Sequence, residues 1–241
     1  MNFETFTRKN KIILTKDEKL ICEHGLDLMK NAKDPHHSIN HIRRLFGLLD
    51  EFLVKTKANT KDFDLSLIIM LIIWHDVWLA SQQQAINFHR FLINEIYHPV
   101  GASKMLVKFA KRKGVYTKQV RNLSKIIKYN ESALAAFYLL RPLEKLFYRV
   151  SIEGKIVRDL DLLDAWEKER FDELFDHYVL KNKFNMKYLV IGKFWYYVFL
   201  RNAKPNMLYF KWSKKKFTKM KKILLETIQF HWDNRRDYGI S

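Results

Sequence analysis

The strongest candidates for chemistry in this sequence are a histidine and an aspartate that stand side by side. His75 and Asp76 come directly after Leu65–Trp74, a run of ten residues that is apolar apart from Ser66. Two ionisable groups at the end of a buried element cost free energy unless they are paired or bind something. Metal coordination therefore accounts for this doublet better than a purely structural His–Asp pair does.

Two further segments offer ligands of the same kinds. His37 and His41 are four residues apart, which places them one turn apart on one face of a helix. Asp159, Asp161 and Asp164 stand among leucines in a chain that is otherwise strongly basic. Imidazoles and carboxylates together form a mixed nitrogen and oxygen site that suits Mn²⁺, Mg²⁺, Fe²⁺, Co²⁺ or Ni²⁺. A single cysteine excludes a zinc cluster built from thiolates.

The order of these residues resembles the HD superfamily of metal-dependent phosphohydrolases. Three segments carry the resemblance: DPHHSINHIRRL, LIIMLIIWHDVW and EGKIVRDLDLLDAW. The third is similar to the Asp-Ala-Asp-x-Leu-Asp stretch of a bacterial subgroup that acts on nucleotides. The resemblance implies one divalent cation bound by His41, His75, Asp76 and Asp161. It covers about residues 15–170.

The same resemblance suggests roles for the neighbouring side chains. We expect Asp76 to accept a proton from the attacking water, and His37 to polarise the phosphate or protonate the leaving group. The residues expected to contact the substrate are Arg44, Lys125, Lys128, Asn130 and Asp164. The implied activity is hydrolysis of a nucleotide or another small phosphorylated metabolite.

The sequence also departs from the family pattern. Asn130 stands where many relatives have a further histidine, which favours one metal ion over two. Leu79 stands where some nucleotidases of the superfamily keep an acid, and Ser38 where the subgroup often has an aspartate. A catalytically degenerate HD scaffold that serves as an interaction module is therefore an alternative hypothesis.

Helices must position these residues, since only 7 Gly and 4 Pro are present. The apolar spacing predicts an all-α fold, although the run at 65–74 could also form a strand. The expected helices are 15–33, 36–52, 64–74, 84–97, 101–113, 117–129, 132–149, 153–179, 187–203 and 213–233. We expect one HD-type domain over 1–180 and a C-terminal helical extension over 181–241.

A formal net charge of +18 favours polyanionic partners. Nucleotides, nucleic acids and anionic membrane surfaces all qualify, and a simply solvated lysine-rich surface would have the same composition. The densest runs of basic residues are Lys108–Lys113 and Lys211–Lys222. The second run keeps an HD-type nuclease or a basic nucleic-acid-binding protein open as an alternative.

The remaining features predict a cytoplasmic protein. Cys22 is the only cysteine, so no intramolecular disulfide can form, which suits a reducing compartment. The first residues show no pattern of a signal peptide. The longest apolar run has ten residues, and a membrane-spanning helix needs about 20.

Overall fold

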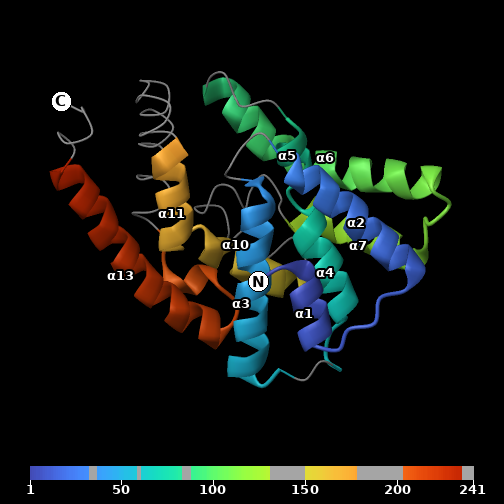
Figure 1. Ribbon diagram of the computed structural model, residues 1–241, viewed down its shortest axis with the longest axis horizontal. Coiled ribbons are helices and arrows are strands. Elements are labelled where there is room, and N and C mark those ends of the chain that lie inside the picture. The colour runs from blue at the N-terminus through green and yellow to red at the C-terminus, as the bar shows by residue number, and fades with distance from the viewer. Residues whose placement is uncertain (33–36, 59–60, 83–87, 131–149, 178–202, 235–241) are drawn as a thin grey trace.

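The computed structural model describes residues 1–32, 37–58, 61–82, 88–130, 150–177 and 203–234 (Figure 1). Within these ranges the chain forms helices and no strand, so the predicted all-α fold is confirmed. The helices are α1 (Phe3–Lys9), α2 (Lys16–Lys30), α3 (Ile39–Thr56), α4 (Leu65–Trp74), α5 (Val77–Ser81), α6 (Phe88–Arg112), α7 (Lys118–Asn130), α10 (Ile152–Asp164), α11 (Lys168–Phe175) and α13 (Lys211–Asp233), with a 3₁₀ turn, η5 (Pro205–Met207), before the last.

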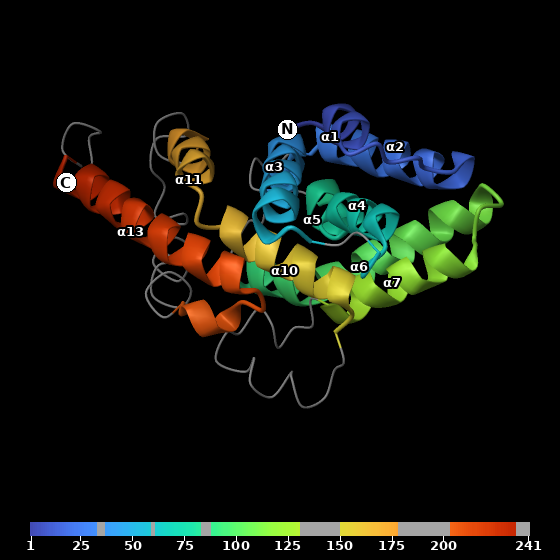
Figure 2. The ribbon, with the colours of Figure 1, turned by 90° about the horizontal axis from the view of Figure 1, so that it is seen from below.

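Helix α4 is the centre of the core. Every residue from Leu67 to Trp74 is buried, because α4 packs against α2, α3, α6, α7 and α10 (Figure 2). A helix that is apolar on all sides must be covered on all sides. Asp64 caps its first turn by accepting a hydrogen bond from the backbone N–H of Leu67 at 3.0 Å. The run 65–74 is therefore a helix and not a strand.

Helices α3 and α10 cover two sides of α4 and bring polar residues to its C-terminal end. Each begins at a serine cap: Ser38 accepts from the N–H of Asn40, and Ser151 from the N–H of Gly154. Their apolar faces are buried against α4 and against each other. Helix α10 consequently lies between the α3–α4 pair and the C-terminal helix α13 (Figure 2).

Several helix boundaries differ from those predicted. Helix α1 was not expected. The segment predicted as one helix over 153–179 is two, α10 and α11, because the chain turns after Asp164 and Trp166 is buried against Phe217, with ring centroids 4.9 Å apart. The two helices predicted at 84–97 and 101–113 are the single helix α6, which contains Pro99. The helices predicted at 132–149 and 187–203 lie outside the described residues.

The C-terminal helix α13 packs against α3, α10 and α11. Asp159 on α10 fixes the start of α13, since the Asp159 carboxylate accepts hydrogen bonds from the backbone N–H groups of Tyr209 at 2.9 Å and Phe210 at 3.0 Å. Phe52 of α3 adds edge-on contacts with the rings of Phe210 and Trp212. Among the described helices, none is both long and apolar enough to cross a membrane.

Candidate metal site

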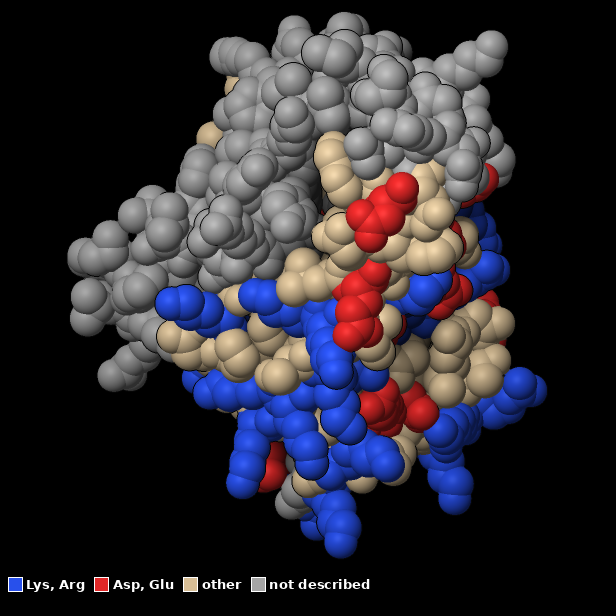
Figure 3. Space-filling model, turned by 90° about the vertical axis from the view of Figure 1, so that its left-hand side faces the viewer, with Lys and Arg blue, Asp and Glu red and all other residues tan. Residues whose placement is uncertain are grey.

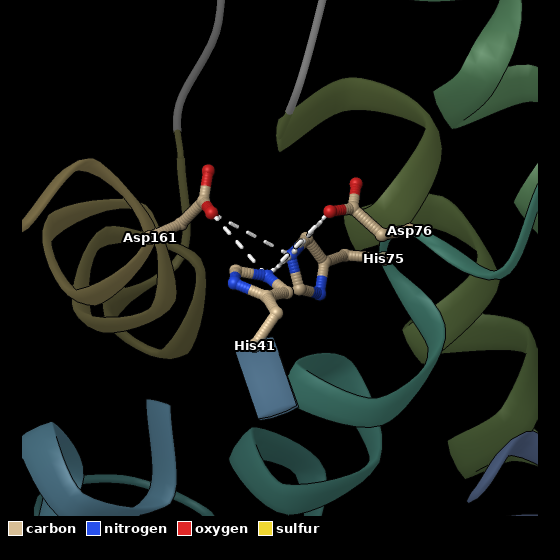
Figure 4. Close-up of side chains that lie close together, drawn as sticks. All are labelled: His41, His75, Asp76 and Asp161. Atoms are coloured by element: carbon tan, nitrogen blue, oxygen red, sulfur yellow. Dashed lines mark hydrogen bonds and ion pairs between the residues drawn. The ribbon is translucent and has the colours of Figure 1, made fainter. Parts of the chain in front are cut away.

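The structure brings His41, His75, Asp76 and Asp161 together at one point (Figure 4). His41 comes from the first turn of α3, His75 ends α4, Asp76 begins α5 and Asp161 lies on α10. One ligand atom of each residue lies within 4.8 Å of those of the other three. Three segments that are distant in sequence, namely α3, the junction of α4 with α5, and α10, therefore supply two imidazole nitrogens and two carboxylate oxygens, a set that could hold a metal ion.

The distances between these atoms fit a shared cation. The two Nε2 atoms of His41 and His75 are 3.2 Å apart. His41 Nε2 lies 3.5 Å from Asp76 Oδ2 and 3.6 Å from Asp161 Oδ1, and His75 Nε2 lies 3.4 and 3.8 Å from the same two oxygens. Ligands about 2.0–2.2 Å from one ion would be about 3.0–3.6 Å apart. The five separations from 3.2 to 3.8 Å are close to those expected around one ion.

The outer nitrogens of both histidines fix their tautomers. His75 Nδ1 lies 2.8 Å from the backbone carbonyl of Ile72, which can only accept a hydrogen bond. His41 Nδ1 lies 2.7 Å from the Asp164 carboxylate. Each Nδ1 therefore carries the hydrogen, and each Nε2 presents a lone pair to the other and to the carboxylates. Lone pairs and carboxylates facing one another repel unless a cation lies between them.

The charges of the cluster also call for a cation. Burial raises the pKa of Asp76, but His75, His37 and His41 outweigh that effect and lower it to about 2. For Asp161, burial again raises the pKa, while the charge interactions with His75 and His41 hold it well below the usual range. Both carboxylates are therefore ionised at neutral pH. In the metal-free site, positive charge on the imidazoles keeps these carboxylates ionised; a divalent ion between them would supply that positive charge and leave the imidazoles neutral.

Asp164 lies behind the site and orients His41. Its carboxylate is fully buried and accepts hydrogen bonds from His41 Nδ1 at 2.7 Å, Arg44 Nε at 2.6 Å and Arg170 Nη1 at 2.7 Å. Arg44 also donates to Glu173 on α11 at 2.6 Å. Two arginines and two acids thus form a network of zero formal net charge that fixes the His41 ring.

The three aspartates of α10 consequently do different things. Asp161 faces the site, with a side chain that is 38% exposed. Asp164 holds His41, and Asp159 attaches the start of α13. The predicted contact between Asp164 and the substrate remains a prediction, and the three donors around this buried carboxylate favour a positioning role instead.

Two more histidines flank Asp76. His37 Nε2 lies 3.9 Å from Asp76 Oδ2, and His98 Nε2 lies 3.9 Å from Asp76 Oδ1. Both imidazoles are largely buried. A role was predicted from the sequence for His37 and none for His98. Its position just before Pro99 in a mixed polar context contains no signal of a contact with Asp76.

The other residues predicted to contact the substrate are Arg44, Lys125, Lys128 and Asn130. Arg44 is buried, and its Nη2 forms no hydrogen bond with a described residue. Lys125 and Lys128 are exposed on α7, and within the described ranges no ion pair or hydrogen bond joins either to the four ligands. Asn130 is the last residue of α7, and its side chain lies outside the described part.

Comparison of the chain with protein-family models, curated proteins and solved structures finds no match. The resemblance to the HD superfamily rests on the three motif segments and on a helical arrangement with a His/Asp cluster that could bind a metal.

Proposed function

We propose that this chain is a metal-dependent phosphohydrolase that acts on a nucleotide or another small phosphorylated metabolite. The observation that supports the proposal most is the convergence of His41, His75, Asp76 and Asp161 with both Nε2 lone pairs turned inward. When bound there, a divalent cation supplies a Lewis acid for a phosphoryl oxygen and lowers the pKa of a bound water.

The side chains around the site divide the remaining tasks. Asp161 is the most exposed of the four ligands, so the substrate approaches from its side. Asp76 is ionised and can accept the proton of the attacking water. His37 and His98 lie on either side of this carboxylate, at 3.9 Å from its two oxygens, where they can pass on or donate that proton.

The test is phosphate release by the purified protein from a panel of nucleoside mono-, di- and triphosphates and sugar phosphates. Each substrate is assayed with Mn²⁺, Mg²⁺, Co²⁺, Ni²⁺ or Fe²⁺ and with a chelator. We expect turnover of at least one substrate that needs a divalent ion. We also expect the His75→Ala and Asp76→Ala variants to reduce this turnover to background, because each removes a ligand.

Asp62→Asn is the matched control, since Asp62 is an exposed carboxylate ahead of α4. It should leave turnover unchanged. A wild-type protein that binds the ion but hydrolyses none of the panel would contradict the enzyme and favour a scaffold. Equal activity of the wild type and the Asp76→Ala variant would show that this site does not perform the hydrolysis.

A further inference from the structure

A cluster of lysines lies on one face of α13 and on the adjoining end of α3. Helix α13 carries Lys211, Lys215 and Lys219 at intervals of four residues, so their side chains share one face, and all three are exposed. The buried residues of α13, such as Phe217 and Leu224, lie on the other face. The basic face of α13 therefore points to solvent.

The end of α3 extends this surface. Lys216 forms an ion pair with Glu51 at 2.8 Å, and the ring of Phe52 contacts those of Phe210 and Trp212. These contacts place the last turn of α3 beside the first turns of α13. Lys55 and Lys57, both exposed, follow in that turn. We call Lys55, Lys57, Lys211, Lys215 and Lys219 the basic patch.

The charges of the basic patch are not neutralised within the described part of the chain. None of its five lysines forms an ion pair with a described carboxylate. The next basic residue on the same face, Lys222, has Glu226 at 3.9 Å and marks the end of the patch. Figure 3, which shows the side of the molecule where α13 lies, has Lys and Arg gathered over its lower half.

Lys55, at the α3 end of the patch, lies far from the metal site. His41 and Lys55 lie at opposite ends of α3, fourteen residues apart, which corresponds to about 21 Å along the helix. A ligand that uses the basic patch must therefore carry repeated negative charges of its own.

We propose that the basic patch binds the phosphodiester backbone of a nucleic acid. Such binding needs only correctly spaced cations, since each ammonium group displaces counterions condensed on the phosphates. A bilayer is the less suitable partner, because a helix that lies on a membrane inserts apolar side chains, and the exposed residues in this part of α13 are Lys211, Lys215, Thr218 and Lys219. The proposal does not depend on the metal site.

The test is fluorescence anisotropy with a labelled single-stranded oligonucleotide of mixed sequence, at several salt concentrations between about 50 and 200 mM. We expect the wild type to bind, with an affinity that falls steeply as salt rises. The Lys211→Gln/Lys215→Gln/Lys219→Gln variant should bind the oligonucleotide at least about tenfold more weakly at the lowest salt concentration. The slope of log K against log salt should be smaller in magnitude by about 2, because three phosphate contacts are lost and each contributes about 0.7.

The control has the same change in net charge at the opposite side of the molecule. The Lys108→Gln/Lys111→Gln/Lys113→Gln variant removes three exposed lysines at and just after the end of α6, and it should keep the wild-type slope. An equal loss in this control, or no binding by the wild type, would overturn the proposal. So would binding of the wild type to phosphatidylserine vesicles without binding to the oligonucleotide. Circular dichroism of each variant verifies that the helices are intact.

Discussion

The Asp164→Asn substitution tests whether a buried carboxylate behind the site controls metal binding. The new side chain keeps the shape of aspartate but loses the charge that faces His41, Arg44 and Arg170 at 2.6–2.7 Å. Removing one partner from a buried ionic network costs about 3–5 kcal/mol of stability. Arg44 retains Glu173 at 2.6 Å, so we expect a loss near about 3 kcal/mol.

The same substitution should weaken the metal site. Loss of an outer partner of a ligating histidine lowers metal affinity by about 10- to 100-fold, which corresponds to about 1.4–2.8 kcal/mol. Isothermal titration with Mn²⁺ or Ni²⁺ measures this affinity, and urea unfolding of the metal-free protein measures the stability. Both measurements are made on the full chain.

Asp159→Asn is the matched control for this experiment. Asp159 is on the same helix and is 1% exposed, against 0% for Asp164, but its carboxylate accepts backbone N–H groups of Tyr209 and Phe210 instead of a histidine. It should lower stability and leave the metal affinity of the folded protein unchanged. Equal metal affinities for Asp164→Asn and the wild type would refute the role assigned to Asp164. Equal losses of metal affinity in Asp164→Asn and Asp159→Asn would refute it as well.

Two further predictions concern the fold and its dependence on pH. A Cβ at Gly25 would lie 2.5 Å from Ile73 Cγ2 and 2.9 Å from Trp74 Nε1, whereas at Gly47 the nearest atom is 3.8 Å away. Gly25→Ala should therefore destabilise the protein by about 1–3 kcal/mol, and Gly47→Ala should stabilise it by up to about 1 kcal/mol. Similar unfolding midpoints of the two variants in urea would contradict the close approach of α2 and α4. Burial raises the pKa of Asp164, but Arg170, His41 and Arg44 outweigh it and hold the pKa well below the usual range. Because the folded value lies below the unfolded value of about 3.9, the stabilisation is present in full above about pH 5 and is lost progressively as the pH falls from there toward the folded value. The stability difference between the wild type and Asp164→Asn should therefore shrink steadily below about pH 5, and a constant difference down to about pH 3 would contradict the assignment.

The sequence predicted the site residues best where the burial of ionisable groups would cost free energy. An apolar run with ionisable residues at its end requires an explanation, which led to His75 and Asp76, and the run is the buried helix α4. Asp161 was preferred to its neighbours by family resemblance, and spacing alone did not separate the three aspartates. Their partners, Tyr209 for Asp159 and Arg170 for Asp164, come from other elements, so their roles depend on tertiary contacts.

The features that were missed lack a local signal. His98 contacts Asp76 only because α6 passes the end of α4, which no pattern around residue 98 indicates. The break between α10 and α11 contains no glycine or proline, and it forms where Trp166 is buried against α13. Pro99, which stands between the helices predicted at 84–97 and 101–113, lies within α6.

Anomalous diffraction from crystals grown with Mn²⁺ tests the metal site most directly. We predict one strong peak about 2.0–2.3 Å from His41 Nε2, His75 Nε2, Asp76 Oδ2 and Asp161 Oδ1, and loss of that peak in the His75→Ala variant. Four side chains that converge in wild-type crystals without a peak between them, or a peak held by other residues, would contradict it.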